Sequence, residues 1–348
     1  MIRPSCWTSS LLVLALAAPL VGQTQTQNRN VSKSGTTAGA FLEIPVGARA
    51  VSVGSAFVAV SGDATTLYWN PAGAARLPET QILFTRSSWF ADLRFDYVAV
   101  ALPLGDAGTL GLSMTSLGSG DMPVRTIERP EGTGELFNAS SIAIGVHYAR
   151  NLSDRFSIGF TGKYVSESIW HMQAQAFAAD IGALFTTGFF NGLRIGALIS
   201  NFGTDLKLAG RDTRSFIRVD DRKMGSNDQI PTNIEMDSWP LPLNFQFGIS
   251  TEVVNNEVYR VTVAMDALHP SDNYESINVG AEFAFQEFLF LRGGYRAIGL
   301  FDREGGLAAG GGVLANLFGG GMQGRLDYGY SDYGRLGTVH VLTVGITL

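Results

Sequence analysis

The stretch SIAIGVHYARNLSDRFSIGFTGK, residues 141–163, holds two runs of alternating apolar and polar residues around a short polar turn, Asn151 to Asp154. In the first run Ile142, Ile144 and Val146 share one face, and small or polar residues occupy the other. A period of two residues is typical of a β-strand whose faces meet different surroundings, and eight to ten residues suit a tilted strand across a bilayer. This stretch therefore predicts a membrane hairpin with an apolar face toward lipid.

Outward from this hairpin, about fourteen such runs follow one another between Gln81 and Leu348. The gaps between them alternate in length. The short gaps are residues 103–107, 151–154, 188–192, 254–257, 286–287 and 316–321, and the longer ones are 118–138, 166–173, 202–240, 267–274, 297–306 and 331–337. Short periplasmic turns and longer outer loops characterise an outer-membrane barrel, whereas a soluble β-sandwich has no reason to keep its long loops at one end. We predict an all-β, up-and-down antiparallel barrel of about fourteen strands.

Composition supports this prediction. The chain has 348 residues, of which 45% are hydrophobic and 16% charged, but beyond position 25 it has no uncharged apolar run of eighteen residues, which excludes spanning helices. A net charge of −6 argues against nucleic acid as a partner. Many of the 42 glycines lie inside the strand runs, where they permit kinks and close packing against something inside the barrel.

The first residues predict the compartment. Arg3 followed by the apolar run Leu11 to Val21 is typical of an export signal, so we expect residues 1–23 to be a signal peptide and residues 24–38 a flexible tail. Cys6, the only cysteine, lies in the signal, which excludes disulfides from the mature chain. We expect the outer membrane of a Gram-negative-type bacterium, residues 81–348 as the barrel, and both termini in the periplasm.

Several charged residues fall in the middle of strand runs. An Arg or Lys facing lipid near the bilayer midplane costs about 2–4 kcal/mol, so these side chains should point into the lumen and pair there. The expected lumen-facing charges are Lys163, Asp180, Arg194, Arg260, Asp266, Glu282, Arg292, Arg325 and Asp327.

Residues 39–80 break the alternation. Their first part, GAFLEIPVGARAVSVGSAFVAVSGDATTLYWNPAGAARL, is rich in Ala, Gly and Val, with turn chemistry at Ser61 to Asp63 and at Asn70-Pro71. A fourteen-stranded barrel is wider than the eight-stranded kind that side chains alone can fill. We therefore expect residues 39–80 to lie in the lumen as a hatch or plug.

This segment resembles the N-terminal signature of the PorV/PorQ family, in the stretches Phe41 to Ala50, Gly54 to Val60, Asp63-Ala64 and Leu67 to Gly73. That family is related to the FadL-type transporters, whose hatch also carries an Asn-Pro-Ala turn. The resemblance implies a hatch in this chain too. Its motif residues here are Gly47, Arg49, Gly54, Asp63, Tyr68, Trp69, Asn70, Pro71, Ala72 and Gly73.

Two functions follow from the resemblance. PorV-like members imply type IX protein secretion, in which the barrel binds secreted cargo by its C-terminal domain and delivers it to a cell-surface attachment complex. FadL-like members imply passage of hydrophobic small molecules through the lumen. The second needs an apolar lumen patch, and the lumen face predicted here is mostly small and ionic, so we favour protein binding. The expected surface-loop contacts are Trp170, Met172, Met236 and Trp239.

Catalysis has little support in the sequence. The four histidines, His147, His171, His269 and His340, fall in separate runs and gaps without metal-ligand spacing. The chain has no Gly-x-Ser-x-Gly elbow, phosphate loop or cysteine nucleophile. We expect no enzyme activity, no metal and no cofactor; the expected partners are outer-membrane lipid with secreted proteins and their attachment complex, or hydrophobic small molecules.

Overall fold

The computed structural model describes residues 33–218, 229–300, 303–317 and 321–348. Residues 34–348 form one compact unit. The predicted signal peptide, residues 1–23, and most of the predicted tail, residues 24–38, lie outside the described residues.

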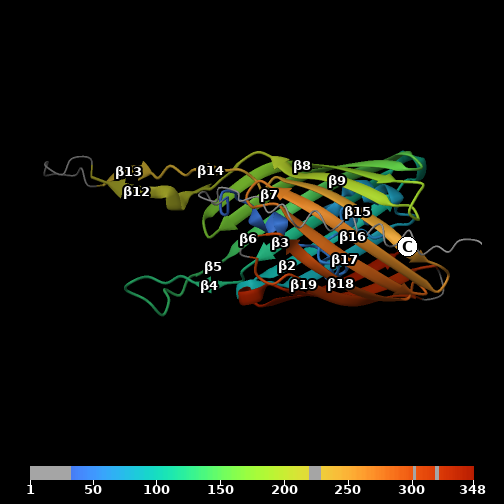
Figure 1. Cartoon of the computed structure of the whole chain (residues 1–348). Helices are drawn as coiled ribbons and strands as arrows, with labels where there is room; N and C mark the ends of the chain where they lie inside the picture. Colours follow the sequence, from blue (N-terminus) through green and yellow to red (C-terminus); the bar gives the residue numbers. More distant parts are fainter. Residues whose placement is uncertain (1–32, 219–228, 301–302, 318–320) are drawn as a thin grey trace, which may run out of the picture. The chain divides into compact units, whose positions relative to one another are not determined.

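Fourteen antiparallel strands close into a barrel within the described residues (Figure 1). Each strand pairs with its neighbours, and the first pairs with the last in the register Gln81↔Thr347 to Ser88↔His340, so the sheet has no open edge. The prediction of a fourteen-stranded barrel is confirmed. The strands are β1 (Gln81–Ser88), β2 (Arg94–Pro103), β3 (Thr109–Gly118), β6 (Ala139–Ser153), β7 (Phe156–Ile169), β8 (Met172–Thr186), β9 (Arg194–Gly203), β15 (Asn244–Asn255), β16 (Tyr259–Pro270), β17 (Ser276–Phe285), β18 (Leu289–Ile298), β19 (Leu307–Asn316), β20 (Gln323–Asp332) and β21 (Thr338–Thr347).

Alternation along each strand separates an inner from an outer face, as predicted. In β6, Val146 is 57% exposed on the outside, while the next residue, His147, is 2% exposed on the inside. The same pattern holds in β21, where Leu342 and Val344 face out and Val341 and Thr343 are buried. Apolar side chains thus cover the outer face, which suits contact with lipid.

The connections follow the predicted alternation, with one difference. Residues 166–173 were expected to form a loop, but β7 continues to Ile169 and β8 begins at Met172, so only Trp170 and His171 make the turn. The Ser and Gln residues there pair across the two strands, as in Ser168↔Gln173. They lengthen the barrel wall at this end with polar residues.

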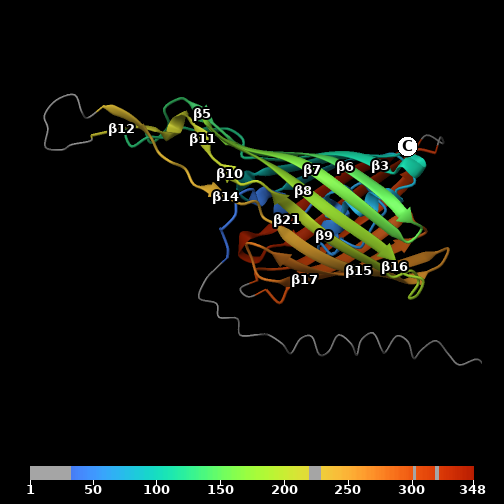
Figure 2. The ribbon, with the colours of Figure 1, turned by 90° about the horizontal axis from the view of Figure 1, so that it is seen from above.

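The long connections carry small strands at one end of the barrel. The connections hold β4 (Met122–Pro123), β5 (Leu136–Phe137), β10 (Leu206–Lys207), β11 (Ala209–Gly210), β12 (Arg214–Ile217), β13 (Ile230–Asn233) and β14 (Ser238–Trp239). Figures 1 and 2 show β4–β5 and β12–β13 projecting from the end opposite the C-terminus. We call the end from which β4–β5 and β12–β13 project the loop end, and the end that holds the C-terminus the turn end.

The two ends of the described chain lie at opposite ends of the barrel. Leu348 donates its N–H to Thr80 at the turn end. Thr37 instead bonds Asp272 in the β16–β17 loop, and Ala38 donates its N–H to Pro240, both at the loop end. The chain therefore runs the length of the barrel before β1, and the periplasmic position of both termini stays a prediction.

Short helical turns make up the N-terminal segment, residues 39–80. They are η2 (Ala40–Glu43), α2 (Ala48–Ser52), α3 (Thr66–Trp69) and η3 (Pro71–Arg76). The α2 helix contacts β18 to β21, and η3 contacts β3, β6, β7 and β8. The segment therefore lies against the inner face of the wall on both sides.

No helix in the described part of the chain is long and apolar enough to cross a membrane.

Candidate functional site: the N-terminal segment and the loop-end cavity

Glycines of the wall bring the N-terminal segment into backbone contact with the strands. A Cβ added to Gly280 would lie 2.1 Å from the carbonyl oxygen of Val53, and one on Gly159 would lie 2.3 Å from the carbonyl carbon of Pro71. Such approaches are possible only without a side chain. An added Cβ would also lie within 3.0 Å of backbone or side-chain atoms of the segment at Gly111, Gly182, Gly196, Gly248, Gly294, Gly310 and Gly329.

These nine contacts belong to nine different strands. Gly145 and Gly345 also lie inside strands, but an added Cβ at these two positions would not meet the segment. We call the set of nine the glycine seats, because each receives the backbone or a side chain of residues 48–72.

Two of the motif glycines adopt backbone conformations that favour glycine. Gly47 has φ 86°, and a Cβ there would lie 2.7 Å from the Thr65 side chain. Gly54 has φ 66°, and its Cβ would lie 2.6 Å from the backbone nitrogen of Tyr295 in β18. Both positions combine a left-handed turn with close packing, which explains why the signature has glycine there.

The Asn70-Pro71-Ala72 turn ties the segment to the wall by hydrogen bonds. The Asn70 amide donates to the carbonyl oxygens of Val58 and Ala183, at 2.8 and 3.0 Å, and its oxygen accepts the N–H of Ala72. Asn70 caps η3, and Pro71 follows at the first helical position, where it needs no hydrogen-bond partner.

Tyr68 and Trp69, the aromatic pair of the motif, form hydrogen bonds within the segment. The Tyr68 hydroxyl donates to the carbonyl oxygens of Leu42 and Ile44, and the Trp69 indole donates to Val46. Gly73, the last motif residue, packs on Thr66, with 3.0 Å from its ideal Cβ to that side chain. These motif residues therefore pack or form hydrogen bonds within the segment.

A buried ion cluster joins α2 to β17, β18 and β20. The Arg49 guanidinium donates to both carboxylate oxygens of Glu282, at 2.7 and 2.8 Å, and to Asp63 at 2.9 Å. Arg292 bridges Glu282 at 2.7 Å and Asp327 at 2.6 Å. Burial of this many charges requires mutual pairing of this kind, since an unpaired buried charge costs several kcal/mol.

Asp63 is held ionised in this cluster. Burial alone would raise the pKa of its carboxyl, but the positive charges of Arg49 and Arg325 and a hydrogen bond from Thr65 outweigh it and lower the pKa to about 2. Asp63 therefore remains negative at any physiological pH and fixes Arg49 in place.

The opposite half of the inner wall is apolar. Phe95, Tyr97 and Val165 are at most 1% exposed and pack in one cluster with Leu67 and Val46 of the segment. The prediction of a mostly small and ionic lumen face was therefore wrong for this half. In the run RFDYVAVALP of β2 both faces carry large apolar residues, so alternation alone does not show which face lies inside.

All nine expected lumen-facing charges lie on the inner side of the wall, buried or nearly so. Besides the ion cluster, Lys163 pairs with Asp180 at 2.6 Å and Arg194 with Glu252 at 3.3 Å. Asp266 has no cationic partner among the described residues but accepts the N–H groups of Phe57 and Val58, at 2.6 and 2.9 Å. Most of these charges thus bind the segment or stabilise the wall beside it.

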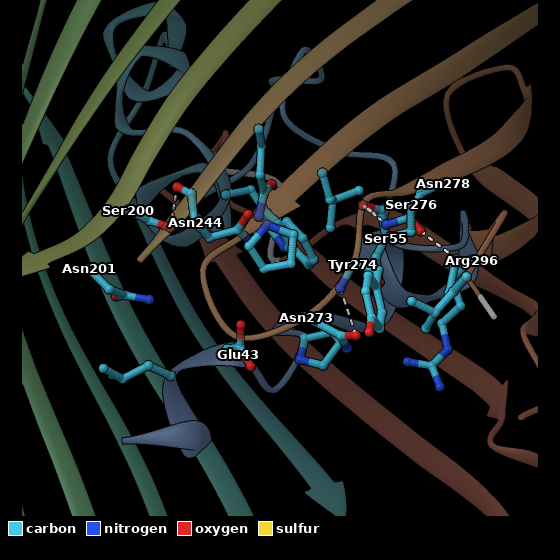
Figure 3. Close-up of a pocket in the computed structure, with 18 of the residues that line it drawn as sticks. Glu43, Ser55, Ser200, Asn201, Asn244, Asn273, Tyr274, Ser276, Asn278 and Arg296 are labelled. Carbon is cyan, nitrogen blue, oxygen red and sulfur yellow. Dashed lines mark hydrogen bonds between the residues drawn. The ribbon is translucent and has the colours of Figure 1, made fainter. Parts of the chain in front are cut away.

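A cavity of about 490 Å³ lies above the segment at the loop end. Tyr68, Trp69 and Glu43 of the segment contribute to its lining. Figure 3 shows Asn201 and Asn244 on one side, Asn273 and Tyr274 at its centre and Arg296 at the far side. Its lining mixes amides, aromatic rings and charges, which suits a ligand with hydrogen-bonding groups.

Glu43 lines this cavity. Desolvation by the surrounding protein, together with repulsion from Asp272, raises the pKa of its carboxyl to about 7.

The four expected surface contacts lie at the loop end, but apart from the cavity. Trp170 is 45% exposed in the β7–β8 turn, and Trp239 is 46% exposed in β14, where it pairs with Leu206. Met172 pairs with Gly210 of β11, and Met236 lines a separate shallow cavity beside β12 and β13. These side chains are thus spread over the loop-end surface rather than gathered at one point.

Sequence reasoning missed the cavity residues Glu43, Asn244 and Arg296. The positions of the longer gaps could have indicated these cavity residues. The gaps 267–274 and 297–306 were both assigned to the loop end, and side chains at the strand ends that flank them, such as Arg296, must converge there in a closed barrel.

No group of three or more His, Cys, Asp or Glu residues in the described ranges could hold a metal ion. His171 bonds Asp212 at 3.0 Å, and both side chains are partly exposed.

Comparisons with known proteins bear on both fold and family. A family model described as type IX secretion system protein PorV matches residues 24–266, well over half of the chain. A comparison with the curated proteins gives no match.

Several solved structures share the fold of this chain, among them proteins described as transporters. The toluene transporter TodX of Pseudomonas putida matches with a TM-score of 0.55 and 10% identity, covering 87% of this chain and 97% of TodX. The toluene transporter TbuX of Ralstonia pickettii matches at 0.53 and 11% identity over 87% and 97%. A FadL homologue of Pseudomonas aeruginosa matches at 0.50 and 9% identity over 87% and 98%. At such identities the likeness concerns the fold alone.

Proposed function

Because the chain belongs to the PorV family of type IX secretion proteins, we propose that this outer-membrane barrel binds secreted proteins at its loop end and hands them to a surface attachment complex. In this proposal the loop end faces the outside of the cell and the turn end the periplasm. The barrel is a binding platform and not an enzyme.

The observation that carries the proposal is the way the N-terminal segment is held. Its backbone or side chains meet the glycine seats in nine strands, and its Arg49 is bound to Glu282 and Asp63 inside the wall. A solute crossing the lumen would have to displace all of these contacts at once. We infer that the segment acts as a fixed plug, which leaves the loop-end surface as the working part of the molecule.

Passage of hydrophobic small molecules, the alternative function, would use the apolar half of the lumen. That half is occupied, because Leu67, Val46 and neighbouring residues of the segment pack on Phe95 and Tyr97. A hydrophobic solute would compete with these side chains for the same surface. The packing therefore favours protein binding over transport.

The test is capture of secreted proteins from detergent-solubilised outer membrane by the affinity-tagged barrel. We expect recovery of secreted proteins that share a C-terminal domain, and a several-fold loss in a Trp170→Ala/Trp239→Ala variant. Both side chains are exposed at the loop end. Phe189→Ala is the matched control, since Phe189 is a 60% exposed aromatic residue in a turn-end connection.

Two results would contradict the proposal. One is equal capture by the loop-end variant and the Phe189→Ala control, which would show that the loop end does not bind cargo. The other is purification of the wild-type barrel with a fatty acid or detergent chain in its lumen and no captured protein, which would favour the transport function.

A further inference from the structure

The charged side chains that line the loop-end cavity do not all pair with one another. Its acidic and basic lining residues are Glu43, Lys163, Arg296, Arg303 and Glu304. Lys163 is paired with Asp180 at 2.6 Å, and Glu304 is paired with Arg335. The other three, one acid and two arginines, form no ion pair with a described residue. Figure 3 shows the acid, Glu43, and one of the arginines, Arg296, on opposite sides of the cavity.

Both arginines lie against aromatic rings. The guanidinium carbon of Arg296 is 3.4 Å from the ring centre of Tyr333, and that of Arg303 is 4.6 Å from the ring centre of Tyr295. The Nε of Arg296 is buried, so only its terminal N–H groups can reach a molecule in the cavity. Asp332 attracts Arg296 but lies beyond ion-pair distance. Terminal N–H groups from two arginines are suited to the two oxygens of one carboxylate.

The asparagines of the cavity have hydrogen-bonding capacity that the protein leaves unused. Asn201 and Asn278 bind backbone carbonyl groups, at 3.1 and 3.3 Å. Asn273 accepts the N–H of Tyr274 at 2.8 Å, but its NH₂ group binds no described residue. The side-chain oxygen of Asn244 also has no partner in the described part of the chain. An amide both donates and accepts hydrogen bonds, as a hydroxyl group does, so this side of the cavity suits a ligand with several hydroxyl groups.

The geometry of the wall disfavours a peptide or a hydrocarbon as the ligand. The strands β9, β15 and β17, which line the cavity, each pair with a strand on both sides. An extended peptide therefore finds no free strand edge to pair with. An alkyl chain would leave the amides of the lining without partners, at about 1–3 kcal/mol for each. A sugar ring needs only side-chain partners, and its apolar face can pack on an aromatic ring such as Tyr274.

We propose that the loop-end cavity binds a saccharide unit that carries a carboxylate. The carboxylate accepts hydrogen bonds from the terminal N–H groups of Arg296 and from Arg303. Ring hydroxyl groups bind Asn273 and Asn244, and a hydroxyl group on the opposite side donates to Glu43. The cavity volume, about 490 Å³, lies in the range of small-ligand sites. This inference goes beyond the proposed function, and cargo capture and saccharide binding succeed or fail separately.

The experiment uses the full-length mature protein, purified in a polyoxyethylene detergent so that no sugar headgroup competes for the cavity. The probes are α-1,4-linked trigalacturonate and the galactotriose that reduction of its carboxyl groups yields. Isothermal titration calorimetry at low salt measures the dissociation constant of each. We expect trigalacturonate to bind at least tenfold more tightly than galactotriose, because only the acid offers carboxylates to the two arginines. Acetate, which has the carboxylate but no hydroxyl groups, should bind at least tenfold more weakly than trigalacturonate.

Variants assign the effect to the cavity. Arg303→Gln and Arg296→Gln should each reduce the preference for the acid several-fold, and the double variant should abolish it. Asn273→Ala should weaken the binding of both trisaccharides and leave the preference unchanged. Arg125→Gln is the matched control, because Arg125 is an exposed arginine in the β3–β6 connection outside the cavity. Heat-modifiable migration on a gel verifies that each variant retains its barrel.

Equal binding of trigalacturonate and galactotriose by the wild-type protein would overturn the inference, as would an undiminished preference in the double variant. N-acetylated triglutamate separates a saccharide from an acidic peptide: if it bound as tightly as trigalacturonate, the site would be one for acidic peptides and the inference would be wrong. Capture of secreted proteins by the Arg296→Gln/Arg303→Gln variant is measured in parallel. Capture at the wild-type level together with loss of trigalacturonate binding is the expected result, and it keeps the two functions apart.

Discussion

The two halves of the inner wall hold the N-terminal segment by different means. On the side of β1, β2 and β6 to β8, buried apolar side chains such as Phe95 and Tyr97 pack on Leu67. On the side of β17 to β20, Glu282 and Asp327 bind arginines, one of which, Arg49, belongs to the segment.

This difference suggests separate roles for the two halves: one buries apolar surface of the segment, and the other sets the segment's position. Apolar packing is non-directional and would tolerate a shifted segment, whereas a guanidinium that meets two carboxylates permits few arrangements. The apolar half therefore supplies much of the favourable free energy of seating the segment, and the ionic half fixes its register along the barrel. The four predictions below test this division.

The largest effect is expected from Glu282→Gln. This change leaves Arg49, Arg292 and Arg260 facing one another without the carboxylate that all three contact. Loss of one partner from a buried ionic group costs about 3–5 kcal/mol of unfolding free energy. Urea titration followed by tryptophan fluorescence and by heat-modifiable migration measures the loss.

Glu287→Gln is the control for this prediction. Glu287 also pairs with Arg260, at 2.6 Å, but its side chain is 57% exposed. Exposed pairs contribute about 0–1 kcal/mol. If the two variants lost similar amounts, the ionic half would not be the positioning element described above.

Leu67→Ala tests the apolar half. Leu67 is 1% exposed and packs on the seat at Gly111, where an added Cβ would meet it at 2.7 Å. Truncation of a buried leucine costs roughly 2–5 kcal/mol, and here the low end is expected because neighbouring apolar side chains can relax into the space. The urea midpoint measures the cost, and Leu112→Ala, at a position 60% exposed on the outer face, is the comparison.

Leu67→Ala and Glu282→Gln should also differ in how uniquely the segment is positioned in the barrel. Leu67→Ala should weaken the segment without changing its register, whereas Glu282→Gln should allow alternative positions. Limited proteolysis of residues 39–80 distinguishes these outcomes: a single slow cleavage pattern fits the first, and several new cleavage sites fit the second. The same pattern in both variants would argue against a division of roles.

Gly280→Ala tests the glycine seats. Its Cβ would lie 2.1 Å from the backbone oxygen of Val53, so the segment or the strand must move, at a cost of about 1–3 kcal/mol. Gly293→Ala is the matched control, because nothing lies within 4 Å of its ideal Cβ. A midpoint for Gly280→Ala that equals that of Gly293→Ala would show that the seat is not tight.

The sequence predicts the barrel well because strands and turns are recognised from patterns among neighbouring residues. Alternation at Ile142 to Tyr148 and the short turn at Gln286-Glu287 each follow from a few neighbouring residues, and strand number follows from counting them. The expectation that the mid-strand charges face inward follows from an equally local argument, since lipid excludes them.

The interior was predicted less well because its contacts are distant in sequence. Arg49 and Glu282 are separated by 233 positions, and nothing near either residue identifies its partner. Phe95 and Tyr97 were missed as lumen residues since β2 is apolar on both faces. The cavity at Arg296 depends on how three loops converge, which alternation does not describe.

The smallest expected effect is a pH dependence that originates at Asp63. Since the folded pKa, about 2, lies below the ordinary value of 3.8, the group stabilises the folded state above pH 4, and this contribution is lost as the pH falls toward 2. Between pH 5 and pH 3 the loss is about 1 kcal/mol of unfolding free energy. Asp63→Asn should be less stable than wild type at pH 7 and should lose less on acidification, because its side chain cannot titrate. Urea midpoints of the two proteins at pH 7, 5 and 3 measure the difference, and parallel pH profiles would mean that Arg49 is held by Glu282 alone.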